Sequence, residues 1–223
     1  MSSNNSATVD RYLEAIFYIA SEGVIVRPGR LATWLSVSPP TVTEALRRLE
    51  RDGWIRIKKD RSVLLTPSWL KTASNLVRHH RILERWLTDV LGLDWATADD
   101  EADRLSSAIS DFLIDRIDAS LNRPLTCPHG NPIPGREAPY GKLIALADLK
   151  ADTLATVRRI SEVAEHEARD LLLMLAEHAI GEGSEVRVTE SKLGSHDVAV
   201  MIADEPIALS IEAAQLIWVE VAA

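Results

Sequence analysis

Cysteine and long apolar runs are both scarce in this sequence. Its 223 residues include a single cysteine, Cys127, so a disulfide within the chain is excluded and a reducing compartment is favoured. No run of about 18 apolar residues occurs, so we expect no membrane-spanning helix. The first ten residues contain neither a basic nor an apolar stretch, so we expect no secretory signal there and a cytoplasmic protein.

Charge is unevenly distributed along the chain. The net charge of −8 argues against nucleic-acid binding by the chain as a whole. Residues 1–66, however, hold ten Lys and Arg against seven Asp and Glu, whereas the rest holds 15 against 26. This asymmetry favours an N-terminal segment that contacts phosphates, although a merely uneven surface would have the same composition.

Three helices are expected before residue 53. Residues 8–22 carry apolar side chains at helical spacing, and residues 31–35 indicate a short second helix. Ser38 is suited to cap a third helix, and the two prolines after it fit a first turn, where a missing N–H group has no cost. The third helix should end at Gly53.

A period of two over residues 54–66 predicts a β-hairpin with a charged tip. Together with the helices, it is typical of a winged helix-turn-helix over residues 1–70, whose third helix reads the major groove of DNA. Protein interaction is the alternative use of such a domain. The expected DNA-facing residues begin the third helix, whereas Arg47, Arg48 and the hairpin tip should lie nearer phosphates. The set is Ser38, Pro40, Thr41, Thr43, Glu44, Arg47, Arg48, Lys58, Lys59 and Arg61.

Two long helices are expected next, at residues 67–92 and 97–121, each with an apolar stripe. They predict a helical dimerisation domain over residues 71–140, since two-fold DNA sites are read by two-fold proteins. A Pro- and Gly-rich loop should follow at residues 122–142.

The remaining residues, 141–223, predict a small β-barrel of SH3-like size, so the fold class is mainly α with a small β part. Strands are expected at 153–160, 183–188, 198–202 and 216–221, with a helix at 165–179.

Four stretches of this sequence resemble the diphtheria toxin repressor family of iron- and manganese-dependent regulators. They are SPPTVTEALRRLERDGWI; VRHHRILERWLTDVLGLDW; ISDFLIDRIDASL with CPHGNPIPG; and LLLMLAEHAIGEGSEVRV with AAQLIWVEV. They cover nearly the whole chain in the family's order. The resemblance implies a repressor that binds a palindromic operator of double-stranded DNA as a metal-dependent homodimer, with a C-terminal FeoA-type, SH3-like domain.

The family pattern also implies two metal sites, and the sequence departs from the first of them. The positions matching that primary site are Arg11, Glu14, Asp103, Ser106 and Ser107. Serine is a poor ligand for Mn²⁺ or Fe²⁺, and a guanidinium repels a divalent cation. We therefore predict that this primary site is degenerate and empty of metal. Three arrangements are open. Arg11 could pair with Asp103, or it could point into solvent. Alternatively, a weak metal site could persist nearby at Glu14, His80 and Asp103.

The second implied site is better preserved. His80 and Glu84 lie four residues apart on one helix face, and the loop supplies Cys127 and His129. A carboxylate from the start of the third domain completes such sites. Glu162, Glu165 and His166 are candidates, of which we favour Glu165, and Asp99 is a further possibility. These donors suit a divalent transition metal (Mn, Fe, Zn or Co), with one site per subunit. Without the resemblance, they would indicate only a surface pair and a free thiol.

Three other functions remain open on the sequence. A metal-independent member of the same family would bind DNA without the primary site. An enzyme using Cys127 and His129 is disfavoured, because no third group to orient a base and no phosphate-binding loop is evident. A purely structural scaffold is disfavoured by the basic hairpin.

Overall fold

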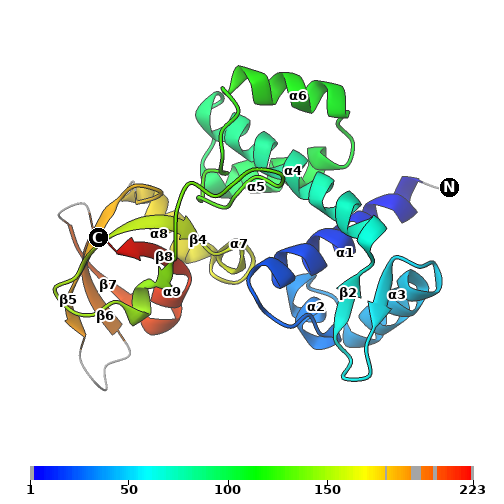
Figure 1. Ribbon diagram of the computed structural model, residues 1–223, viewed down its shortest axis with the longest axis horizontal. Coiled ribbons are helices and arrows are strands. Elements are labelled where there is room, and N and C mark those ends of the chain that lie inside the picture. The colour runs from blue at the N-terminus through cyan, green and yellow to red at the C-terminus, as the bar shows by residue number, and fades with distance from the viewer. Residues whose placement is uncertain (1–2, 179, 192–196, 203–204, 222–223) are drawn as a thin grey trace.

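The computed structural model describes residues 3–178, 180–191, 197–202 and 205–221. The chain forms an N-terminal helical unit with a small hairpin, a central group of helices and a C-terminal unit with a sheet (Figure 1). Each of the three has its own cluster of buried apolar side chains. Among the described residues, no helix is both long and apolar enough to cross a bilayer.

The N-terminal unit has the expected winged helix-turn-helix order. Its elements are α1 (Ser3–Ser21), α2 (Pro28–Trp34), α3 (Pro39–Arg51), β1 (Ile55–Ile57) and β2 (Val63–Leu65). The Ser38 hydroxyl accepts a hydrogen bond from the Thr41 backbone N–H at 3.4 Å, and two prolines occupy the first turn of α3. Gly53 follows the helix with φ of +78°. Both local predictions are confirmed.

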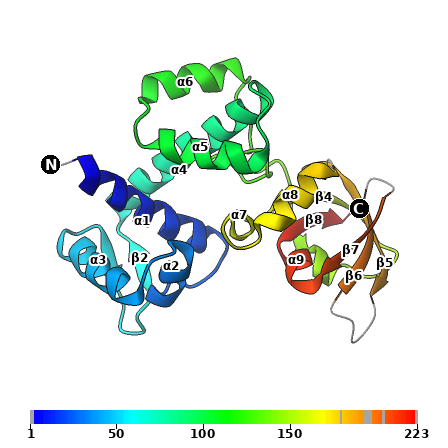
Figure 2. The ribbon, with the colours of Figure 1, turned by 180° about the vertical axis from the view of Figure 1, so that it is seen from behind.

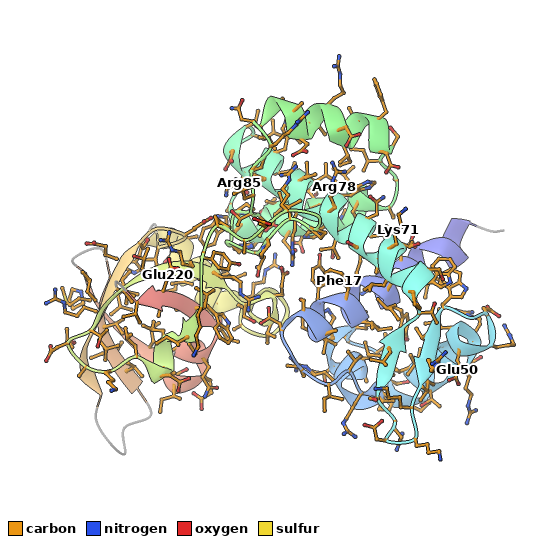
Figure 3. All side chains as sticks on the ribbon, in the orientation of Figure 1. Phe17, Glu50, Lys71, Arg78, Arg85 and Glu220 are labelled. Carbon is orange, nitrogen blue, oxygen red and sulfur yellow. The ribbon has the colours of Figure 1, made fainter. Side chains whose placement is uncertain are left out.

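The hairpin is attached to the helices on both of its sides. The two strands pair antiparallel, and the Glu50 carboxylate, labelled in Figure 3, accepts a hydrogen bond from the Ile57 N–H at 2.8 Å. On the other side, Trp54 stacks on Trp69 with ring centroids 3.7 Å apart. Trp69 belongs to the first turns of α4 (Pro67–Asp89), so the hairpin packs directly on the helix that leads into the central unit.

The central unit differs from the sequence prediction at one point. The single helix expected over residues 97–121 is two helices, α5 (Trp95–Ser106) and α6 (Asp111–Ser120). The break has a local cause, because the Ser110 hydroxyl accepts a hydrogen bond from the Leu113 N–H at 3.3 Å and so starts a new helix. Helix α4 packs on both, and α6 lies at the outer edge of the molecule (Figure 1).

The C-terminal unit is an antiparallel sheet with short helices against it (Figure 2). Its elements are β3 (Ile144–Ala145), β4 (Leu154–Ile160), α7 (Glu162–Glu167), α8 (Arg169–Glu177), β5 (Glu185–Ser191), β6 (Asp197–Ile202), β7 (Glu205–Ser210), α9 (Ile211–Gln215) and β8 (Ile217–Val221). The predicted helix at 165–179 is split at Ala168, whose extended φ of −140° interrupts it; position 179 lies outside the described residues. Strands β3 and β7 were not expected.

The predicted SH3-like β-barrel is not closed among the described residues. The strand order is β3-β8-β4-β5-β6-β7, and the two edge strands, β3 and β7, do not pair with each other. Strand β3 has only two residues, both paired with β8, before the chain turns into a short helical turn. It therefore offers too little backbone to complete a barrel with β7. The sheet stays open, with bulges in β4 and β5.

Candidate functional site

The residues expected to face DNA belong to α3, with its N-cap Ser38, and to the hairpin tip. Helix α3 turns its apolar residues inward, and most of the predicted set is exposed, whereas Arg48 is half-buried. The Thr43 hydroxyl donates to the Pro39 carbonyl at 2.9 Å, which orders the first turn. The side chains of Lys58, Lys59 and Arg61 are exposed at the hairpin tip.

Sequence reasoning missed the residue that holds the hairpin tip in place. Arg27, just before α2, donates from Nη1 to the backbone carbonyl of Asp60 at 3.1 Å. The Asp60 carboxylate in turn accepts from the Ser62 N–H and hydroxyl, at 3.1 and 2.7 Å, which lowers the pKa of Asp60. No local sequence pattern joins residues 33 positions apart, so only the fold identifies this support for the basic tip.

A buried group of metal-ligand type lies where α4 meets the Pro-rich loop. Glu84 comes from α4, and Cys127 and His129 come from the loop; all three are buried, and one ligand atom from each lies within 4.8 Å of the others. His129 Nδ1 lies 2.8 Å from Glu84 Oε1. The Trp95 and His129 rings pack nearly perpendicular to each other, with centroids 4.8 Å apart.

The loop has a defined geometry that brings its two donors inward. The Cys127 N–H donates to the Asn131 carbonyl at 2.9 Å, and the Gly130 N–H donates to the Cys127 carbonyl at 3.0 Å. Gly130 has φ of +80°, which a residue with a side chain rarely adopts. The turn therefore places the Cys127 thiol and the His129 ring two residues apart on the same side.

The chemistry of this donor set fits a divalent transition metal. Burial, reinforced by the nearby Glu84 charge, raises the pKa of the Cys127 thiol to about 11, while His129 acts in the opposite direction. The thiol is therefore protonated at neutral pH, and a metal must displace that proton to bind the thiolate. A thiol, an imidazole and a carboxylate gathered in a dry interior match the ligands preferred by Zn²⁺, Fe²⁺ and Co²⁺.

His80, one helical turn before Glu84, lies in a second group. Its Nε2 is 3.3 Å from Asp99 and its Nδ1 is 3.2 Å from Asp103, both on α5. Burial by itself would lower the pKa of His80, but the carboxylates of Asp103 and Asp99 outweigh it and raise that pKa well above 6.5. The structure thus brings His80 to the carboxylates of α5 and separates it from the cysteine-containing group.

Of the positions matched to the family's primary site, only Asp103 belongs to this second group among the described residues. Arg11 and Ser107 are exposed, and the buried Ser106 hydroxyl donates to the Asp103 carbonyl at 3.4 Å. Arg11, Glu14 and Asp103 line one hollow of about 450 Å³. Burial raises the pKa of Glu14 to about 7. An arginine and two serines do not fit a divalent cation, whereas Glu14 and Asp103 remain suitable donors.

A carboxylate of the third domain lies near the group of Glu84, Cys127 and His129. Glu162, at the start of α7, is buried and pairs with Arg81 of α4 at 2.5 Å, and its charge reaches Cys127. The side chains of Glu165 and His166 lie outside the described residues. Sequence reasoning missed Arg81, although an arginine within the apolar stripe of α4 was a usable signal for a buried ion pair.

An exposed apolar surface lies on α6 and the neighbouring end of α5. Phe112 is 74% exposed, Leu113 48% and Leu105 39%. Phe112 is the most exposed of the large apolar side chains described, and neighbouring exposed apolar side chains are typical of protein contacts. Helix α6 itself lies at the outer edge of the central unit, away from the sheet (Figure 1).

Comparison with known families divides the chain into three matches. Residues 5–63 match the iron dependent repressor, N-terminal DNA binding domain. Residues 66–135 match the iron dependent repressor, metal binding and dimerisation domain, and residues 144–221 match the FeoA domain.

Individual proteins are similar over most of the chain. The iron-dependent repressor IdeR of Mycobacterium tuberculosis (strain ATCC 25618 / H37Rv) is 34% identical, covering 96% of each chain. The diphtheria toxin repressor of Corynebacterium diphtheriae is 33% identical, covering 82% of this chain and 84% of the relative. A solved structure of a manganese-dependent transcriptional repressor in complex with manganese is 33% identical, with a TM-score of 0.83 over 96% of this chain and 99% of the other.

Proposed function

This chain belongs to the iron-dependent repressor family, and we propose that it represses transcription by binding a palindromic operator in double-stranded DNA as a metal-loaded homodimer. The buried group of Glu84, Cys127 and His129 carries the metal part of this proposal. Because its target is chromosomal DNA, it acts in the cytoplasm. A repressor needs no catalytic step, so Cys127 and His129 serve as ligands and not as a nucleophile and a base.

The metal is held at one site per subunit by Glu84, Cys127 and His129, while Glu162 of the third domain stays paired with Arg81 beside this group. A bound divalent cation would neutralise the carboxylate and thiolate and cross-link α4 to the loop. Zn²⁺, Fe²⁺, Co²⁺ and Mn²⁺ are the candidates, with the thiolate favouring the first three. Glu165, the ligand favoured on sequence, stays a prediction.

The family's primary site carries no metal in this protein. Arg11, Ser106 and Ser107 replace its ligands, and a protonated His80 between Asp99 and Asp103 offsets part of the local negative charge without a metal. This contact joins α4 to α5 through protein charges, so the metal dependence of DNA binding rests on the group of Glu84, Cys127 and His129. The pairing of Arg11 with Asp103 stays a prediction.

The three units divide the work. Residues 1–70 bind DNA through α3 and the hairpin tip, and residues 71–140 hold the metal and form the dimer, with the exposed apolar surface of α6 at the contact. Residues 141–223 form the FeoA-type domain, which packs against the metal loop.

The test compares DNA affinity of the chelated protein with that of protein loaded with Mn²⁺, Fe²⁺ or Zn²⁺, in wild type and Cys127→Ala. The probe is a duplex selected from a random library by metal-loaded wild type. We expect one metal to raise wild-type affinity at least about tenfold, within the usual range of coupling energies, and to act weakly on the variant. If wild type binds the duplex equally well with and without metal, the metal-independent alternative is supported. If wild type and Cys127→Ala bind the metal equally well, the ligand set is misassigned.

A further inference from the structure

A short segment of the third domain, residues 158–163, touches both other units. It comprises the end of β4 and the start of α7, which lie beside the end of α1 and near α4 in both views (Figures 1 and 2). We call it the junction segment. Its contacts differ on its two sides, and each side is specified by hydrogen bonds or ion pairs.

One side of the junction segment is bonded to the metal loop. The Ile160 N–H donates to the carbonyl of His129 at 2.8 Å, and the Asn131 side-chain amide donates to the Ile160 carbonyl at 3.0 Å. Gly130, between these partners, packs so closely on Arg158 that no side chain fits there. The backbone of a candidate metal ligand is therefore directly attached to Ile160.

The other side of the junction segment is bonded to the winged unit through one acidic residue. Glu22, the residue just after α1, pairs with Arg159 at 2.7 Å, and its carboxylate accepts a hydrogen bond from the Glu162 N–H at 3.3 Å. The Glu22 and Arg159 side chains are only 4% and 14% exposed. A pair this buried is sensitive to position, because a shift leaves a charge in a dry site.

We infer that Glu22 and Arg159 are positioning residues that couple the metal loop to the DNA-binding unit. Ile160 is hydrogen-bonded to the metal loop, and its neighbour Arg159 is paired with Glu22 after α1. A shift of the loop on metal binding therefore shifts the C-terminal end of α1. Helix α1 packs on α4 and on the hairpin strand β2, so its position sets the position of the reading surface. This inference rests on the proposed function, and neither residue belongs to the metal group or the DNA surface.

The variants separate coupling from simple loss of structure. Glu22→Gln and Arg159→Met remove the ion pair, and Arg159→Lys keeps the charge and should largely restore coupling. Arg158→Met is the matched control: the Arg158 side chain pairs at 2.9 Å with Glu220, labelled within the third domain in Figure 3. All are full-length proteins, titrated with Zn²⁺ and Mn²⁺ and with the selected duplex.

Two readouts are measured, metal-dependent DNA affinity and amide hydrogen exchange at residues 18–26. In wild type and Arg158→Met, metal should raise DNA affinity and slow exchange at the end of α1. In Glu22→Gln and Arg159→Met, the metal dissociation constant should stay within about twofold, while the metal-induced gain in DNA affinity falls about tenfold or more and the exchange change disappears.

Equal metal responses in wild type and Glu22→Gln would overturn the inference. So would metal binding to wild type with no change of exchange at residues 18–26. If wild-type DNA binding ignores metal altogether, the proposed function fails, and the exchange measurement still decides whether the loop and α1 are coupled.

Discussion

Gly130 offers a sharp test of how the metal loop packs on the third domain. A Cβ atom added there would overlap the Arg158 carbonyl oxygen and lie 2.9 and 3.1 Å from the Arg158 carbonyl carbon and the Arg159 Cα. All three are backbone atoms that cannot rotate away. Gly130→Ala must therefore move the loop off β4.

The expected cost follows from two contributions. The positive φ of +80° costs an alanine about 1 kcal/mol. Moving the loop also breaks the hydrogen bonds that Ile160 makes with His129 and Asn131, each worth about 1 kcal/mol. Gly130→Ala should thus lower the free energy of unfolding by about 3 kcal/mol and weaken Zn²⁺ binding, because His129 precedes the altered residue.

Gly135→Ala is the matched control. Gly135 lies in the same loop with φ of +86°, and no atom of the described residues lies within 4 Å of its added Cβ. It should lose only the backbone contribution, about 1 kcal/mol, and keep its Zn²⁺ affinity. Urea unfolding followed by circular dichroism, with Zn²⁺ titration, measures both effects. Equal losses in the two variants would refute the packing described for this loop.

Three further predictions concern separate parts of the molecule. Burial raises the pKa of Glu14 from 4.5 to about 7, so the free energy of unfolding should fall as pH rises through that interval. Glu14→Gln should lessen this fall by up to about 3 kcal/mol at pH 8. Parallel curves of stability against pH for the two proteins would contradict this. Lys59→Ala should reduce the salt dependence of DNA binding by about one counterion, and an effect no larger than that of Lys150→Ala would remove the hairpin tip from the interface. Phe112→Ala should weaken the dimer at least about tenfold in sedimentation equilibrium, whereas Leu173→Ala, an exposed apolar residue of the third domain, should not.

Local signals predicted the winged unit well. Ser38, the two prolines after it and Gly53 each act on the backbone within a few residues, so their effect is visible in the sequence. The break between α5 and α6 also has a local cause, since Ser110 caps the start of α6. The apolar spacing continues across the break, so the sequence pattern concealed it. The open sheet depends on the length of β3, and two paired residues leave almost no sequence signal.

The metal groups show the limit of spacing arguments. His80 and Glu84 share a helix face, as their four-residue separation predicts. That separation also moves them about 6 Å along the axis of α4, since each residue rises 1.5 Å. His80 therefore lies next to the carboxylates of α5, and Glu84 lies next to the loop. The spacing in the sequence does not tell which partner packs beside each turn of α4, because the fold decides it.

The edge contact of Trp95 on His129 gives the protein a built-in optical probe. Indole emission depends on the immediate surroundings of the ring, and this ring lies 4.8 Å from the imidazole of a candidate ligand. Open-shell ions such as Co²⁺ or Fe²⁺ quench a nearby excited indole, whereas the filled shell of Zn²⁺ does not. Because the chain holds six tryptophans, the difference in emission between wild type and Trp95→Phe isolates this ring, and its quenching distinguishes classes of ion bound at His129.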